Sequence, residues 1–410
     1  MKTHHTETDV LRLTASFSVA LLHSAAARMS GMEPAADGAW VPCLLNALCR
    51  FGVPVFVMIS GRYMLASECS IRRAGSKAAK TLGALLLWSS VYLGYALLAG
   101  WRPAGTGDVI WRLLTEPVHL WYFYAAAALY LLAPVLSVFT RHATHRQFLY
   151  GLALTGTMGC VVVILLRTGR FPMLSAIMEQ TKLPYTTGFL FCYLLGYYLF
   201  RYPLGRRGLI LLGGAGILGW AATFAGTLWL SGRAGAWNDL LLSFYAPNVV
   251  VTSAAVFAWA QRIFGRWAMP DRARRVLAAA AGTTGGIYGL HMLVLWQLEG
   301  MGLPMLAEAL TVYLVSGAVV WVIQRTWHFG RRCLHPAGTK TEEIEGGRHR
   351  RPFFVGFLPC AQTAVCSIMI PEKRDGGKDT WHASGSTTIN ILKCNPLTSG
   401  RGLTSLAASC

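Results

Sequence analysis

Charged residues are scarce in this chain of 410 residues. Asp, Glu, Lys and Arg make up 13% of it, and 54% of the residues are hydrophobic. Soluble globular domains contain about 25% charged residues, so this chain has too few charges to cover a water-exposed surface. The composition excludes an ordinary soluble protein and predicts a polytopic membrane protein whose main partner is the lipid bilayer.

Acidic residues are the scarcer of the two signs. The chain has 37 Lys and Arg against 18 Asp and Glu, a formal net charge of +19. The cations lie in short segments between apolar runs, which is typical of membrane topology and not of a nucleic-acid-binding surface. We therefore expect no nucleic-acid partner.

Several short motifs are missing as well. None of the ten cysteines belongs to a Cys-x-x-Cys pair, and their scatter favours neither a disulfide framework nor a zinc site, so we expect no bound metal. There is no Gly-x-Ser-x-Gly motif of the kind that presents a nucleophilic serine. The first apolar run lacks a cleavage site, so no cleavable signal peptide is expected.

Long apolar runs are what the sequence has in abundance. A helix needs about 20 such residues to cross a bilayer, and the alternation typical of a membrane β-barrel is absent. We predict an all-α membrane bundle of about ten transmembrane helices. The predicted spans are residues 9–28, 43–65, 80–99, 118–138, 147–167, 184–201, 208–231, 240–262, 278–298 and 304–326.

The loops between these runs alternate in charge. Cations follow the second, fourth, sixth and eighth runs, whereas segments 29–40 and 299–303 have none. Segment 167–182, which carries three cations, is an exception. The positive-inside rule therefore predicts a multi-pass protein with both termini in the cytoplasm.

The chain divides by composition into two parts. Residues 1–330 form the predicted membrane domain, and residues 331–410 are polar, without helical or strand periodicity. The second part is either a disordered cytoplasmic tail or, after about residue 350, not native sequence, as an altered reading frame would produce.

Ionisable residues within the apolar runs are the first candidates for chemistry. In "DVLRLTASFSVALLHSA", Arg12 and His23 are eleven residues apart, which is three helical turns plus about 20°, so they share a face and differ by about 16 Å in height. They can be a snorkelling arginine and a packing histidine. Such groups are costly in a membrane and usually face a cavity or partner, which makes them functional candidates.

Two further histidines fall in the outer halves of their predicted spans, on the same side as His23. His119 stands beside Trp121, so it either contacts a substrate or belongs to an interfacial aromatic belt. His291, within "GGIYGLHMLVLWQL", is either a catalytic residue or a hydrogen-bonding partner of a neighbouring helix.

The stretch "RFGVPVFVMISGRYML" opens on an arginine that is hard to reconcile with a simple membrane anchor. Arg50 lies about two turns below the predicted outer surface. We expect it to face a polar tunnel and meet an anionic or carbonyl-bearing ligand, the alternative being a buried pair with Glu or Asp. Pro54 should loosen the helix, and Ser60-Gly61 should allow another helix to approach closely.

Five segments together resemble the acyltransferase-3 family, whose members are bacterial integral-membrane acyltransferases that modify surface polysaccharides and related acceptors. The resemblance runs from about residue 7 to 330 and includes the family's arginine–ten residues–histidine pattern at Arg12 and His23. The segments are "DVLRLTASFSVALLHSA", "RFGVPVFVMISGRYML", "HLWYFYAAAALYLLAPVL", "LPYTTGFLFCYLLGYYL" and "GTTGGIYGLHMLVLWQL".

The resemblance implies a reaction and a location. Such enzymes take an acyl group, commonly acetyl, from cytoplasmic acyl-CoA and pass it to a hydroxyl of a polysaccharide or lipid-linked sugar. It implies a bacterial inner membrane and no permanently bound cofactor. Arg12, Arg72 and Arg73 are then candidates for the donor phosphates.

The resemblance also suggests roles around the reacting atoms. His23 is the candidate general base, and Arg50 or His291 would stabilise the oxyanion. His119, Trp121 and Tyr288 are candidates for substrate binding. Direct transfer is favoured over an acyl-serine intermediate, since Ser60 has no His or acidic neighbour in sequence.

Two other classes stay open at this stage. Ten spans with intramembrane Arg and His also suit a secondary transporter of a small anionic or carbonyl-bearing solute, although no internal repeat is evident. A binding or assembly protein of the cell envelope is the third, but it leaves the Arg12–His23 geometry without a purpose.

Overall fold

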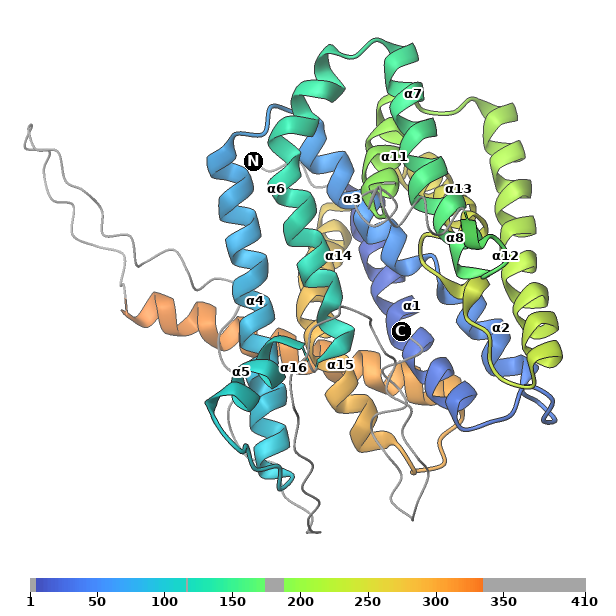
Figure 1. Ribbon diagram of the computed structural model, residues 1–410. Coiled ribbons are helices and arrows are strands. Elements are labelled where there is room, and N and C mark those ends of the chain that lie inside the picture. The colour runs from blue at the N-terminus through green and yellow to red at the C-terminus, as the bar shows by residue number, and fades with distance from the viewer. Residues whose placement is uncertain (1–4, 116, 174–187, 335–410) are drawn as a thin grey trace, which may run out of the picture.

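The computed structural model describes residues 5–115, 117–173 and 188–334, with side chains to residue 326. Every regular element in these ranges is a helix, which confirms the predicted all-α class (Figure 1). The longer helices are α1 (Thr6–Ser30), α2 (Trp40–Cys49), α3 (Gly52–Leu65), α4 (Ile71–Leu98), α5 (Thr106–Thr115), α6 (Trp121–His142), α7 (His145–Gly156), α11 (Leu190–Arg201), α12 (Arg206–Ala234), α13 (Pro247–Phe264), α14 (Asp271–Ala281), α15 (Thr284–Leu298) and α16 (Met305–Leu334). Short elements are η1 (Val118–Leu120), η2 (Thr157–Val162), α8 (Val163–Arg167) and η3 (Leu240–Leu242).

The count of spans differs from the prediction of about ten. Eight helical segments in the described ranges are long and apolar enough to cross a membrane, or nine if α14 and α15, which meet at a 50° bend, form one broken span. The sixth predicted span, 184–201, begins outside the described residues. Its described part is α11, whose 12 residues rise only about 18 Å, well short of a hydrocarbon core of about 30 Å.

Helix α1 lies at the centre of the bundle. It packs against α2, α3, α13, α14, α15 and α16, and most of its side chains are buried. A helix buried on nearly all sides needs no single apolar stripe, and in α1 it holds serines and a histidine as well as leucines. This position lets α1 present different faces to several helices.

Glycines bring α3 and α11 together. A Cβ on Gly61 would overlap the backbone carbonyl of Tyr193, and one on Gly196 would overlap the backbone of Met58. Both backbones therefore approach as closely as small residues permit. This confirms the close approach expected at Ser60-Gly61.

The second predicted span is interrupted at Arg50. Helix α2 ends at Cys49 and α3 begins at Gly52, with helical backbone angles at the two residues between. Pro54 has no N–H to donate to the carbonyl four residues earlier, which is that of Arg50. The interruption that Pro54 favours therefore falls at Arg50, although Trp40–Leu65 still forms one candidate membrane span.

The loops sort onto two ends of the bundle as their charges predict. At one end, Arg28, which precedes the cation-free loop 29–40, donates to the carbonyl of Leu303 in the cation-free loop 299–303 at 2.6 Å. Trp237, in the loop after α12, donates to the carbonyl of Met32 at 2.7 Å. The N-terminus and the α6–α7 turn lie at the other end (Figure 1). Which end faces the cytoplasm stays a prediction.

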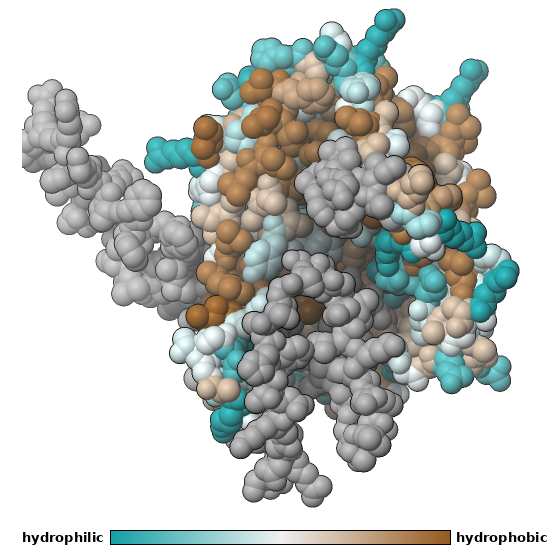
Figure 2. Space-filling view, in the orientation of Figure 1, coloured by the Kyte–Doolittle hydropathy of each residue, from teal (hydrophilic) through white to brown (hydrophobic). Residues whose placement is uncertain are grey.

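The outer surface suits a bilayer. Apolar side chains cover much of the visible face along α4 and α6, and hydrophilic ones project from the end that carries the α6–α7 turn (Figure 2). Helix α16 is steeply inclined to α4 (Figure 1). Residues 335–410, the greater part of the predicted tail, lie outside the described residues, so the side of the C-terminus stays a prediction.

Candidate active site

Three histidines from distant parts of the chain meet inside the bundle. We call His23 of α1, His119 of η1 and His291 of α15 the histidine cluster. The ring centroids of His23 and His291 are 4.9 Å apart, and those of His119 and His291 are 5.7 Å apart. Exposed fractions of 5%, 6% and 1% show that all three are buried. The structure thus brings together the three histidines that the sequence placed on one side of the membrane.

The hydrogen bonds of His291 define its chemistry. Its Nδ1 lies 2.7 Å from the carbonyl oxygen of Tyr288 and 3.2 Å from that of Ile287. Carbonyls only accept hydrogen bonds, so Nδ1 carries the proton. In the neutral ring Nε2 therefore holds a free lone pair, and this buried atom has no hydrogen-bond partner among the described residues.

Two tyrosines frame His119. The hydroxyl of Tyr288 donates to the backbone carbonyl of His119, and the ring of Tyr92 lies 4.7 Å from its imidazole. The hydroxyl of Tyr92 in turn donates to the carbonyl of Gly289 at 3.0 Å. Nε2 of His119 is also buried without a partner among the described residues, so two imidazole nitrogens are available to a ligand.

Arg50 lies beside the cluster, at the α2–α3 break. Its Nε donates to Oδ1 of Asn46 at 2.7 Å, and its guanidinium carbon lies 5.1 Å from the ring centroid of Phe244. Arg50 is only 4% exposed, and its positive charge acts on His23. The Asn46 amide and the Phe244 ring both help to orient this arginine.

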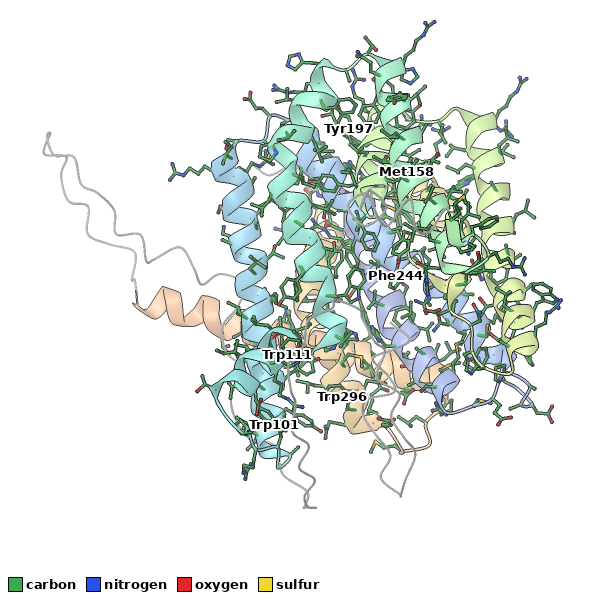
Figure 3. All side chains as sticks on the ribbon, in the orientation of Figure 1. Trp101, Trp111, Met158, Tyr197, Phe244 and Trp296 are labelled. Carbon is green, nitrogen blue, oxygen red and sulfur yellow. The ribbon has the colours of Figure 1, made fainter. Side chains whose placement is uncertain are left out.

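Trp121 contacts the arginine's surroundings instead of the histidines. Its ring centroid lies 5.8 Å from that of Phe244 and 5.4 Å from that of Phe189. Phe244 projects into the bundle beside α1 (Figure 3). Trp121 and Arg50 therefore both lie against Phe244.

The candidates for donor binding lie further towards the N-terminal end of α1. Arg12 is partly buried, and both it and Arg73 act electrostatically on Lys77 of α4. Nζ of Lys77 lies 5.5 Å from the ring centroid of Tyr130. The structure gathers Arg12, Arg73 and Lys77 into one cationic group. Arg72 is exposed, as Arg73 and Lys77 are, and does not belong to this group.

Sequence reasoning missed Tyr92 and Lys77 as members of these groups. Tyr92 looks like any other aromatic residue in an apolar run, and Lys77 was counted only as a loop cation. A lone amide in an apolar segment is a stronger signal, and Asn46 could have been found by the same argument that singled out Arg50.

The described ranges contain no group of three or more His, Cys, Asp or Glu side chains arranged to hold a metal ion. The site contains three imidazoles and a guanidinium beside them, and in at least one imidazole, that of His291, the nitrogen with the lone pair is known to be Nε2. Lone pairs can accept a proton, and a fixed guanidinium can stabilise a negative oxygen.

Comparison with known proteins supports an enzymatic reading. The family model described as an acyltransferase domain, that of the acyltransferase 3 family, matches residues 6–325. This range contains every residue of the histidine cluster, Arg50 and the cationic group. No match was found among curated proteins or among solved structures.

Proposed function

Because the chain belongs to the acyltransferase 3 family and is a membrane-bound acyltransferase, we propose that it moves an acyl group, commonly acetyl, from cytoplasmic acyl-CoA to a hydroxyl of a cell-surface polysaccharide or lipid-linked sugar. The observation that carries this proposal is the burial of His23, His291 and Arg50 side by side. Transfer of an acyl group to a hydroxyl requires a base that accepts the hydroxyl proton and, close to it, a fixed cation that stabilises the oxyanion. We place the protein in the inner membrane of a bacterium.

The donor enters at the cationic group in this proposal. Arg12, Arg73 and Lys77 suit the phosphates of acyl-CoA. Arg12 and His23 lie on one face of α1, about 16 Å apart along the helix axis. That separation is comparable to the reach of the pantetheine arm, so phosphates held near Arg12 can deliver a thioester near His23.

The reaction is a direct transfer. His23 accepts the proton of the acceptor hydroxyl as its oxygen attacks the thioester carbonyl carbon. The new C–O ester bond forms, the C–S bond breaks, and the departing CoA sulfur takes up the proton. In this proposal His119 and Tyr288, beside the histidine cluster, and Trp121, beside Phe244, bind the acceptor.

We assign the oxyanion to Arg50 in preference to His291. A neutral His291 has its proton on Nδ1, committed to two backbone carbonyls, so its Nε2 has nothing to donate. The guanidinium of Arg50 is permanently charged and has donors beyond the Nε bonded to Asn46. Arg50→Gln should therefore lower kcat more than it raises KM.

A label-transfer experiment tests the function. Membranes containing the protein are incubated with acetyl-CoA labelled in the acetyl group, and the products are separated into lipid-linked, polymeric and soluble fractions. We expect covalent label in a glycan-containing fraction. Label that crosses the membrane without covalent attachment would contradict the proposal.

A further inference from the structure

A second group of arginines surrounds a cavity away from the histidine cluster. We call it the arginine pocket; its volume is about 440 Å³. It lies at the N-terminal end of α1, between α1, α3, α11, α12 and α13. Its charged lining residues are Glu7, Arg62, Arg206, Arg262 and Arg266.

The charges in this pocket do not cancel. Arg62 and Glu7 form a buried ion pair with an N–O distance of 2.7 Å. Arg206, Arg262 and Arg266 are exposed, and none of the three forms an ion pair within the part of the chain that the structure describes. One acidic side chain thus stands against four guanidinium groups, which favours an anionic ligand.

The N-terminus of α12 adds to this field. Gly205 precedes the first residue of this 29-residue helix and provides no side-chain cap. Both Gly205 and Arg206 line the pocket. Uncapped N–H groups and the positive end of the helix dipole favour a phosphate or carboxylate there. The N-terminus of α12 and the arginines are two independent features, and both favour a negatively charged ligand.

The pocket is separated from the proposed reaction by α1 itself. Glu7 and Arg12 are five residues apart, so their side chains diverge by about 140° around the helix. Glu7 and His23 are sixteen residues apart and diverge by about 160°. An anion bound beside Glu7 therefore lies behind α1 as seen from the histidine cluster, and it cannot present a thioester to His23.

The remaining walls are apolar. Phe200, Leu204 and Leu209 line the pocket, and Phe200 stacks against the guanidinium of Arg62, with 4.2 Å from carbon to ring centroid. Next to the lining residues, Ile210 and Ile263 are 55% and 54% exposed. A ligand with a phosphate at one end and hydrocarbon at the other fits this combination better than a soluble anion does.

We propose that the arginine pocket binds the phosphate of an anionic phospholipid headgroup, with the acyl chains lying along α12 and α13. The site is independent of acyl transfer. It would hold the ends of α11, α12 and α13 at the membrane surface through charge-assisted hydrogen bonds.

Neutralising the three exposed arginines tests the site. The pocket variant is Arg206→Gln, Arg262→Gln, Arg266→Gln. The control variant Arg207→Gln, Arg272→Gln, Arg275→Gln removes the same charge from exposed arginines outside the pocket lining. Binding of phosphatidylglycerol, phosphatidylcholine, inorganic phosphate and CoA to the purified full chain is measured by native mass spectrometry and by thermal denaturation.

We expect phosphatidylglycerol to bind the wild-type and control proteins and to bind the pocket variant about tenfold more weakly or less. Phosphatidylcholine should not discriminate between them. Equal binding of phosphatidylglycerol by the two triple variants would overturn the proposal. So would loss, in the pocket variant alone, of phosphate or CoA binding without any preference for phosphatidylglycerol, because the ligand is then a soluble phosphate.

The single variant Arg266→Gln provides a second test in case the triple variant fails to fold. Arg266 follows the last residue of α13 and is exposed, so its loss leaves the helix intact. A severalfold weakening of phosphatidylglycerol binding is expected, and unchanged binding would count against the site. None of these readouts depends on activity, so they stay informative even if the proposed reaction is wrong.

Discussion

The two carbonyls that hold Nδ1 of His291 distinguish this residue from His23, although their rings are neighbours. His291 is fixed by its own helix, one turn back along α15, and its orientation does not depend on a ligand. His23 sits on α1 between His291 and the charge of Arg50. The neutral imidazole is the form that a general base needs.

Replacing His23 separates catalysis from packing. A general base contributes about 10²–10⁴-fold in rate, so His23→Ala and His23→Gln should both lose most turnover while acyl-CoA binding persists. Gln keeps some hydrogen bonding but cannot take the proton. Turnover and thermal stability in detergent are the measurements, and His142→Gln, at an exposed histidine, is the control. A folded His23→Gln protein with substantial turnover would transfer the role to His291, whose Nε2 lone pair is available.

Arg12 offers a second residue-level prediction. If it contacts donor phosphates, Arg12→Ala should lose acyl-CoA affinity and Arg12→Lys should retain part of it, because an ammonium cannot reproduce a bidentate contact. Equilibrium binding of acyl-CoA measures both. Arg207→Ala, which removes an exposed cation elsewhere, should bind normally. Equal affinity in all four proteins would make Arg12 structural.

At the scale of elements, backbone approach decides which helices support the site. Helix α3 follows directly after Arg50 and Phe51 and meets α11 through Gly61 and Gly196. Gly289 similarly admits the ring of Trp88, where any Cβ would overlap it, and so brings α4 and Tyr92 to the histidines. Small residues therefore position the helices that carry the candidate active site.

Gly61→Ala tests this packing. The added Cβ would meet the Tyr193 carbonyl, a backbone atom that cannot rotate away, so α3 and α11 must separate. Overpacking of this kind costs about 1–3 kcal/mol. Gly75→Ala in α4 is the matched control, since a Cβ there meets nothing within 4 Å and should be neutral or stabilising by up to about 1 kcal/mol. Thermal denaturation in detergent compares the two, and equal stability would show that the contact is looser than the structure indicates.

Sequence reasoning could identify the lone charged and imidazole side chains in apolar runs, because burying such a group in a membrane is costly and needs a reason. It therefore found Arg12, His23, Arg50 and His291. It could not find Tyr92, whose position depends on how close α4 comes to α15. It also passed over Arg62, the second arginine of the same stretch as Arg50, which has the buried acidic partner that was considered for Arg50.

At the scale of the whole molecule, the sequence showed how long each apolar run is, but it could not show whether that run forms one continuous helix. The sequence did not show the bend between α14 and α15 or the shortness of α11, so the described residues contain eight or nine candidate spans where about ten were predicted. The two cation-free loops, 29–40 and 299–303, do lie at the same one of the two ends of the bundle. It is the link between those ends and the two sides of the membrane that still rests on the positive-inside rule alone.

Cysteine labelling of opposite loops tests that link. Five cysteines are first changed to serine: Cys333, Cys360, Cys366, Cys394 and Cys410. The other five, whose side chains the structure describes, are all buried and can stay. Ala36→Cys and His142→Cys then place single exposed thiols at the two ends of the bundle. In intact cells a membrane-impermeant maleimide should label Ala36→Cys at once and His142→Cys only after permeabilisation, because the positive-inside rule predicts that the cation-rich end faces the cytoplasm. The reverse labelling pattern would mean that the protein has the opposite orientation in the membrane. The histidine cluster would then lie nearer the cytoplasm, and the donor would not need to reach across the bilayer. Labelling of both without permeabilisation would instead show that the cells leak, which a cytoplasmic thiol protein labelled in parallel detects.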